Sequence, residues 1–139
     1  MCQACGLCAV ECPALAISIK RFAVGDVKDR ITRTIQTSDA SVTKVDIICA
    51  QDIEERQELW DSVVTSNGDV TARIPLVCAA RVEEVDMMKP FELGVQSVAI
   101  RRCQKCKYNG ADDRLAKRVA RTQEILKSAG IDKDRLVLE

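Results

Sequence analysis

Short apolar runs alternate with amphipathic stretches from Thr43 to the end of the 139-residue chain. Short runs that are rich in β-branched residues and bounded by turn residues are typical of buried strands. These runs predict strands at Lys44–Cys49, Thr71–Val77, Val95–Arg101 and Leu136–Leu138. A proline within the second run removes a backbone donor, which indicates an edge strand or a bulge.

The stretches between these runs have the apolar period of helices. Asp52, with Glu55 three residues later, forms a capping-box pattern for a helix that extends to Val63. Residues Glu84–Leu93 predict a short helix interrupted by a proline, and Asp112–Ala129 predict the longest helix of the chain.

This order of elements predicts an α/β fold. Strands that alternate with helices through right-handed crossovers give a small parallel sheet with helices on both faces, in a flavodoxin-like order. In such sheets the carboxyl ends of adjacent strands lie along one edge, where α/β folds bind their ligands.

Cysteines stand at or just past the ends of three predicted strands. Cys49 ends the first, Cys78 follows the second, and the Cys-x-x-Cys pair Cys103 and Cys106 follows the third. We therefore expect these thiols to converge on one pocket, where four thiolates could bind one [2Fe–2S] cluster or one zinc ion. The alternative for Cys49 and Cys78 is that both are ordinary buried thiols.

Basic residues surround the pair formed by Cys103 and Cys106. One interpretation is that their charge lowers the thiol pKa values, and the other is a solvated basic loop or a partner-binding patch. These basic residues are Arg101, Arg102, Lys105 and Lys107.

The composition narrows the chemistry further. The chain has 8 cysteines and no histidine, which excludes Ser-His and Cys-His catalytic pairs, His-ligated zinc and Rieske clusters built from this chain alone. The 21 basic and 21 acidic residues balance, so net charge indicates neither nucleic acid nor membrane binding. With no secretory signal and no long apolar run, we expect a cytoplasmic protein whose cysteines serve metal or redox chemistry, without direct membrane insertion.

The first residues carry the most specific motif. Cys2, Cys5, Cys8 and Cys12, followed by Pro13, form the C-x2-C-x2-C-x3-C-P run of bacterial-type ferredoxins, which binds [4Fe–4S] clusters. Zinc or structural thiols are the alternative. Because no second run is present, Cys12 is either the fourth ligand of this cluster or a ligand of another cluster in a missing N-terminal portion, and we expect the polypeptide to be part of something longer.

Three regions follow from these patterns. Residues 1–22 form a half-ferredoxin segment closed by a strand at Ile17–Arg21, and residues 23–43 form a linker with one helix on Val27, Ile31 and Ile35. Residues 44–139 form the α/β domain.

Within the α/β domain, several segments resemble the delta subunit family of methyl-viologen-reducing hydrogenase. The likeness covers about Lys44–Glu139. It implies a [2Fe–2S] cluster and electron transfer between a hydrogenase or similar donor and the flavoprotein of heterodisulfide reductase. With the ferredoxin segment, the chain resembles the C-terminal end of heterodisulfide-reductase-A-like proteins, including those found in quinone-interacting oxidoreductase complexes. The segments are Ile74-Pro-Leu-Val-Cys78-Ala-Ala-Arg81-Val82, Phe91-Glu-Leu-Gly94-Val, Cys106-Lys-Tyr108 and Ile125-Leu-Lys-Ser-Ala-Gly-Ile131, continuing to Arg135.

The sequence departs from this family at two places in its cysteine pattern, and it lacks the histidines that are common near the family's last cysteine pair. The family has a Cys-x-x-Cys after its first strand, whereas Cys49 is followed by Ala50, Gln51 and Asp52, and it has four residues between its last two cysteines, where this chain has Gln104 and Lys105. The second site is therefore open to a [2Fe–2S] cluster, zinc or no metal.

The leading hypothesis is an iron–sulfur electron-transfer component that works with a flavin-bearing, heterodisulfide-reductase-A-like partner and a donor such as hydrogenase, in an anaerobic setting. Its alternative is a docking module of a redox complex whose α/β domain has lost its cluster or binds zinc. A dithiol reductase using Cys103 and Cys106 resembles thioredoxin only in the cysteine pair.

Overall fold

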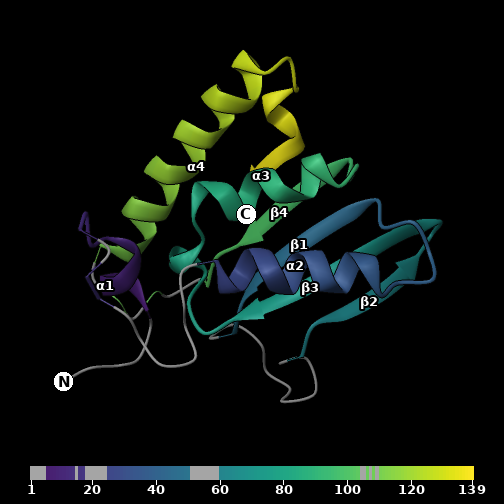
Figure 1. The fold of residues 1–139 in the computed structure, drawn as a ribbon, viewed down its shortest axis with the longest axis horizontal. Helices are drawn as coiled ribbons and strands as arrows, with labels where there is room; N and C mark the ends of the chain where they lie inside the picture. The colour runs from purple at the N-terminus through teal and green to yellow at the C-terminus, as the bar shows by residue number, and fades with distance from the viewer. Residues whose placement is uncertain are drawn as a thin grey trace.

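A computed structural model of the chain describes residues 6–14, 16–17, 25–50, 60–103, 106, 108 and 110–139. Its centre is a five-stranded sheet with the strand order β2-β3-β1-β4-β5 (Figure 1). The strands are β1 (Lys44–Cys49), β2 (Ser62–Ser66), β3 (Asp69–Leu76), β4 (Ser97–Arg101) and β5 (Leu136–Leu138).

Four of the strands are parallel. β1 lies at the centre and pairs with β3 on one side and β4 on the other, and β5 pairs with β4. These strands coincide with the four predicted apolar runs, so the prediction of an α/β fold built on a small, mostly parallel sheet is confirmed. Among the described strands, β2 at one edge is the one that runs antiparallel to its neighbour, β3.

Helices α2, α3 and α4 form one layer; within the described residues no helix of the predicted second layer is present, and residues 51–59 of the crossover after β1 lie outside them. α3 packs against both α2 and α4, and α2 and α3 lie across the same face of the sheet in Figure 1. The crossovers through α3 and α4 step in the same direction along the sheet, so right-handed connections bring both helices to one face. The helices are α1 (Leu7–Val10), α2 (Asp26–Gln36), α3 (Glu84–Glu92) and α4 (Ala111–Ser128), with 3-10 turns η3 (Ala79–Arg81) and η4 (Lys133–Arg135).

The helix predicted from Asp52 to Val63 is wrong in its last part. Residues Ser62–Ser66 form strand β2, and residues 51–59 lie outside the described residues. Asn67 and Gly68 join β2 to β3, and both have positive φ, 51° and 88°, as a two-residue type I′ hairpin requires. The Asn-Gly dipeptide is thus the signal of a hairpin.

The strand predicted to close the ferredoxin-type segment cannot be compared with the fold. From residue 18 to residue 21 it lies outside the described part of the chain. The helix predicted in the linker is present as α2, and the predicted positions Val27 and Ile31 are buried in it.

The proline of the second predicted strand also has a different setting from the one expected. β3 is an interior strand and keeps an unbroken register with β1 through Pro75 and Leu76. The edge strand β2 pairs with β3 only from Asp69 to Arg73. Pro75 therefore lies where β2 no longer continues, which reconciles a proline with an interior strand.

A single apolar core joins the sheet to the helices. Val45 and Ile47 of β1 belong to it, together with the buried side chains of Ile31 in α2 and Leu115 in α4. Leu7 of α1 belongs to the same core. The segments that precede β1 thus pack on the α/β domain, while the proposed domain limits stay a prediction.

A capping box begins α3. The backbone N–H of Glu83 donates to Oδ2 of Asp86 at 2.8 Å, and Glu83 accepts in return from the backbone of α3. Asp86 is buried, and its Oδ1 has no hydrogen-bond partner within the described residues. Burial is the main reason that the pKa of Asp86 rises from 3.8 to about 6, and the nearby carboxylate of Glu83 adds to the rise.

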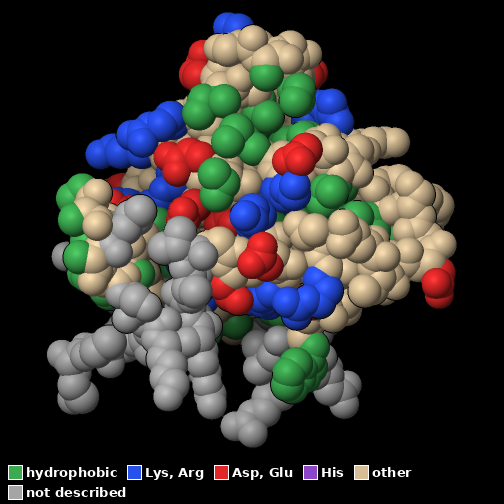
Figure 2. All heavy atoms as spheres, viewed as in Figure 1, with side chains coloured by type: hydrophobic (Ala, Val, Ile, Leu, Met, Phe, Trp, Pro, Cys, Tyr) green, Lys and Arg blue, Asp and Glu red, His purple; other side chains and the backbone are tan. Residues whose placement is uncertain are grey.

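Charges of both signs are interspersed on the face shown in Figure 2. This agrees with the balance of basic and acidic residues in the whole chain. Among the residues that the structure describes, none of the helices combines the length and the apolar character needed to cross a membrane.

We predict that Ile31→Ala destabilises the whole α/β domain, because the side chain is 0% exposed and fills the core between α2 and the sheet. The free energy of unfolding in urea should fall by about 2–5 kcal/mol. Ile125→Ala is the matched control, since this helical isoleucine is 41% exposed and should cost less than about 1 kcal/mol. Equal losses for both variants would show that α2 does not share the core.

Asp86 should make stability depend on pH. Because its folded pKa of about 6 lies above the unfolded value of 3.8, the stabilisation is fully present below about pH 4 and is lost as the pH rises through 6. The loss should be about 1–3 kcal/mol. Asp86→Asn keeps an acceptor for the Glu83 N–H and should make the free energy of unfolding nearly independent of pH in this range. If urea titrations of the variant still show the same loss with pH, other groups cause the dependence.

Candidate functional site

The sheet register brings three chain segments to the same level. Ile48 of β1 is paired with Pro75 of β3 on one side and with Arg101 of β4 on the other. Because the three strands are parallel and end together, the residues that follow them emerge at one edge. Cys49 is the last residue of β1, and Cys78 and Cys103 each stand two residues beyond the ends of β3 and β4.

All four predicted cysteines of the α/β domain line one pocket at this edge. The pocket measures about 230 Å³, including its open mouth, and is bordered by the first residues of α4 and η3. Its lining consists of Cys49, Cys78, Cys103 and Cys106 with Ala79, Ala80, Arg102, Ala111, Asp112 and Leu115. The convergence expected from the strand order is therefore present, whereas metal binding by these thiols stays a prediction.

The four thiols differ in their access to solvent. Cys49 and Cys78 are 2% and 3% exposed, and Cys103 is half-buried. Cys106 is exposed, and its Sγ lies 3.5 Å from the carbonyl oxygen of Tyr108. The burial of Cys49 and Cys78 would suit ordinary core thiols as well, but their place in the same lining as Cys103 and Cys106 favours a shared site.

The environment of Cys103 opposes its ionisation. Burial raises the pKa of the Cys103 thiol from 9.0 to about 12, and the neighbouring thiols of Cys49 and Cys106 act in the same direction. These three sulfur groups thus lie close enough to affect one another. A bound cation would remove this penalty, because it stabilises thiolates that otherwise repel each other.

Of the two interpretations of the basic residues around the pair, a lowered thiol pKa is not supported for Cys103 by Arg101 and Arg102, the two of them that the structure describes. Arg101 forms ion pairs with Asp46 at 3.0 Å and with Glu139 at 3.5 Å. Arg102 pairs with Asp112 at 3.0 Å. Their charges are offset by carboxylates, and Lys105 and Lys107 lie outside the described residues.

The donor set decides which groups the pocket fits. Within the described part of the chain, no three cysteine or carboxylate side chains are arranged in ligating geometry around a common point. The pocket offers thiols against an apolar wall, which suits zinc or an iron–sulfur cluster and does not suit the hard cations that prefer oxygen ligands. By residue type the pocket therefore suits a thiolate-bound metal group, while the binding of one stays a prediction.

The N-terminal motif is described only in its second half. Cys2 and Cys5 lie outside the described residues, whereas Cys8 is exposed in α1 and Cys12 is half-buried just beyond it. Gly6 begins α1 with φ of +83°, and a Cβ at this position would lie 3.6 Å from Nε of Arg81. That distance is an ordinary contact, so it is the positive φ that favours glycine at this position.

η3 connects the two groups of cysteines. Its residues Ala79 and Ala80 line the cysteine pocket, and η3 also contacts α1. Arg81, the last residue of η3, is buried next to Gly6 and lies 3.7 Å from a carboxylate oxygen of Asp26 in α2. Burial lowers the pKa of Arg81, and the carboxylate of Asp26 opposes this shift. One short turn therefore separates the pocket from the segment that carries Cys8 and Cys12.

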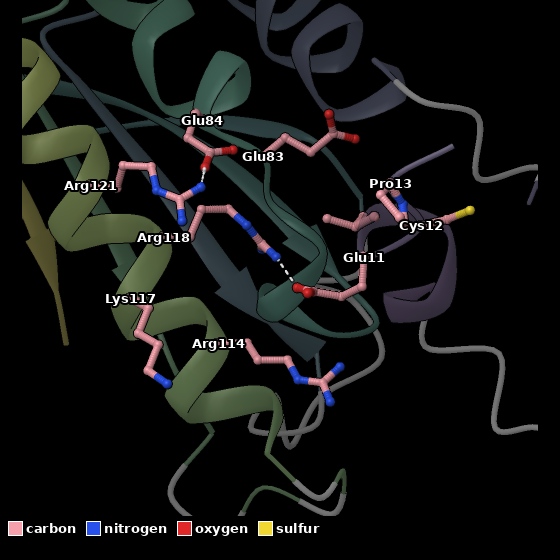
Figure 3. A pocket seen from close by; sticks show the side chains of 10 residues that line it. Glu11, Cys12, Pro13, Glu83, Glu84, Arg114, Lys117, Arg118 and Arg121 are labelled. Atoms are coloured by element: carbon pink, nitrogen blue, oxygen red, sulfur yellow. Dashed lines mark hydrogen bonds and ion pairs between the residues drawn. The ribbon is translucent and has the colours of Figure 1, made fainter. Parts of the chain in front are cut away.

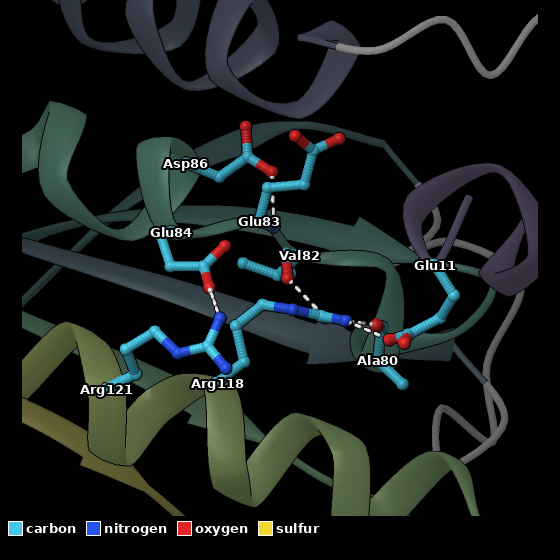
Figure 4. Close-up of polar contacts among 8 residues, drawn as sticks. All are labelled: Glu11, Ala80, Val82, Glu83, Glu84, Asp86, Arg118 and Arg121. Carbon is cyan, nitrogen blue, oxygen red and sulfur yellow. Dashed lines mark hydrogen bonds and ion pairs between the residues drawn. The ribbon is translucent and has the colours of Figure 1, made fainter. Parts of the chain in front are cut away.

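A buried arginine, which the sequence analysis missed, holds this arrangement together. Arg118 of α4 donates to the carbonyl oxygens of Ala80 and Val82, both at 2.8 Å, and also pairs with the carboxylate of Glu11 (Figure 4). It thereby ties α4, η3 and the residue before Cys12 to one point. The signal in the sequence was an arginine on the buried stripe of α4, one position before the apolar Val119.

Comparison with known proteins identifies the α/β domain. No curated protein matches the chain. The sequence model of the family described as methyl-viologen-reducing hydrogenase, delta subunit, matches residues 45–139. This match confirms the resemblance for the domain that contains the cysteine pocket, and it does not extend to the ferredoxin-type segment. The chain therefore belongs to the delta subunit family of methyl-viologen-reducing hydrogenase.

Proposed function

We propose that this chain is an iron–sulfur electron-transfer component of a redox complex. Its family is associated with hydrogenase and heterodisulfide reductase complexes. The single observation that carries the proposal is the gathering of Cys49, Cys78, Cys103 and Cys106 around one pocket at the carboxyl edge of the sheet. A family assigned to redox complexes and a thiol-lined pocket support the same chemistry.

Two sets of cysteines would hold two clusters. Cys49, Cys78, Cys103 and Cys106 would bind a [2Fe–2S] cluster, which suits four thiolates contributed by separate loops. The N-terminal set would bind a [4Fe–4S] cluster, with Cys12 as its fourth ligand. Such groups, when bound, take up and release single electrons. The N-terminal ligands are Cys2, Cys5, Cys8 and Cys12.

The surroundings of the pocket suit this role. Ala79, Ala80 and Leu115 give it an apolar wall that excludes water from the buried thiols Cys49 and Cys78. The first residue of α4, Ala111, lines the pocket as well, so the N-terminal end of an 18-residue helix favours negative charge there. The chain thus offers thiolate ligands and a means of stabilising their charge.

The position of η3 favours transfer between the two sets. Its residues Ala79 and Ala80 lie in the pocket wall, and the same turn contacts α1. Cys106 on one side and Cys8 on the other are both exposed, so each set has a thiol near the surface where a partner could approach. The partners we propose are a heterodisulfide-reductase-A-like flavoprotein and a donor such as hydrogenase, in the cytoplasm.

A second candidate is a docking module without a cluster, or one that binds zinc. The lack of ligating geometry among the described cysteine and carboxylate side chains favours the form without a cluster, and it does not favour zinc. A dithiol reductase is less suitable, since a reactive thiol needs a lowered pKa and that of Cys103 is raised to about 12.

Anaerobic reconstitution tests the proposal. The loaded chain should contain about six iron and six acid-labile sulfide ions, as expected for one [4Fe–4S] and one [2Fe–2S] cluster. On reduction, two distinct EPR signals should appear. Cys103→Ser should remove the signal of the second cluster alone, and Cys8→Ser that of the first alone, so each variant serves as the control for the other.

The alternatives give different results in the same experiment. A docking module would keep its spectrum after Cys103→Ser. Zinc without sulfide, or iron whose amount does not change in either variant, would contradict the electron-transfer proposal.

A further inference from the structure

A second concave surface lies beside Cys12, outside the cysteine pocket. It runs between the end of α1, the start of α3 and one side of α4, and it encloses about 760 Å³, including its open mouth (Figure 3). Cys12 and Pro13 form one wall, and charged side chains of α3 and α4 form the others. We call this surface the α4 groove.

Basic residues on α4 follow the groove along its length. Arg114, Lys117, Arg118 and Arg121 all line it. Their spacing of three, four and seven residues places them on one side of a helix, over a length of about 10 Å. Like charges at these spacings destabilise a helix unless carboxylates offset them. The groove is thus a place where anionic groups are favoured.

Two of these cations already bind carboxylates of other segments. Arg118 is paired with Glu11, which precedes Cys12, and Arg121 is paired with Glu84 at 3.3 Å (Figure 4). Each pair joins α4 to a different part of the chain. The side of α4 that lines the groove therefore already pairs with carboxylates of other segments of the chain.

The other two cations have no such partner. Arg114 and Lys117 are exposed, and the side chain of neither forms a hydrogen bond or an ion pair with any other residue in the described ranges. Both extend from α4 at the end of the groove nearer to the start of that helix (Figure 3). They leave two positive charges along a surface whose other cations are neutralised.

We propose that the α4 groove binds an acidic segment of a partner protein, whose carboxylates pair with Arg114 and Lys117. A protein segment fits better than a small polyanion, because Glu11 and Glu84 already neutralise Arg118 and Arg121, and the carboxylate of Glu83, which also lines the groove, would repel concentrated negative charge. Isolated carboxylates spaced along a peptide can reach the two free cations and avoid the acidic wall. The length of the groove also suits two turns of helix or a short extended segment.

The α4 groove lies next to the N-terminal segment that carries Cys8 and Cys12. Cys12 forms part of the groove wall with its sulfur pointing away from α4 (Figure 3), so a bound partner would lie against the segment whose cysteines we assign to the [4Fe–4S] cluster. Electron transfer to or from the docked partner rests on the proposed function, whereas the docking contact itself does not. The groove would thus position an electron-transfer partner at the N-terminal end of the proposed relay.

Binding of a defined peptide tests the contact. The probe is a fluorescently labelled helical peptide with glutamates spaced three and four residues apart, and its control has glutamines at the same positions. Fluorescence anisotropy with the full chain at low salt should show binding of the glutamate peptide only. The affinity should fall as salt is added, because the contact is an exposed ionic one.

Charge reversal localises the site. The double variant Arg114→Glu and Lys117→Glu should weaken binding of the glutamate peptide about tenfold or more. Acidic residues near the start of α4 are favourable to a helix, so the variant should fold, which circular dichroism verifies. The matched control, Lys127→Glu with Lys133→Glu, removes the same charge at the exposed far end of α4 and in η4 and should leave affinity unchanged.

Three results would overturn the docking proposal: equal binding of both peptides, equal weakening by the control variant, or displacement of the peptide by inorganic pyrophosphate that binds at least as tightly. The last result would identify a small-anion site. The docking proposal and the electron-transfer proposal can be tested separately, because peptide binding is measured on the iron-free chain and on the reconstituted chain. Failure of reconstitution with intact peptide binding refutes electron transfer alone.

Discussion

The common level at which β1, β3 and β4 end is the constraint on which the candidate site depends. Parallel pairing in register places Cys49 next to the segments that lead to Cys78 and to Cys103. No single segment could build this pocket, since its thiols come from loops separated by tens of residues. A shift of register in one strand would turn its side chains to the other face and move its cysteine out of the set.

The helical layer forms the other side of the cysteine pocket at that edge. α4 begins at the pocket, and Arg118, farther along it, binds η3 and Glu11 at the same time. An arginine that is so deeply buried is tolerated because its charge meets a carboxylate and its N–H groups meet carbonyl oxygens. The same helix thus closes the cysteine pocket, fixes the segment that carries Cys12 and lines the α4 groove with cations.

Much of this could be predicted from the sequence because local patterns decide it. The strands β1 and β5, the helices α2 and α4 and the convergence of four cysteines follow from apolar period and strand order. What failed depends on tertiary context. Strand β2 was mistaken for a helix because Val63 fits either period, and the role of Arg118 depends on a carboxylate more than one hundred residues away. The same holds for the pKa of Cys103: a lowered value was one of two interpretations, and burial with the neighbouring thiols raises it instead.

Anomalous diffraction at the iron absorption edge, from crystals of the anaerobically reconstituted chain, tests the central claim most directly. The account predicts an iron peak among Cys49, Cys78, Cys103 and Cys106, at the carboxyl ends of β1, β3 and β4, and a second peak beside α1 on the other side of η3. A peak at the zinc edge in the first position, or thiols there with no metal while the rest of the chain holds iron, would contradict it.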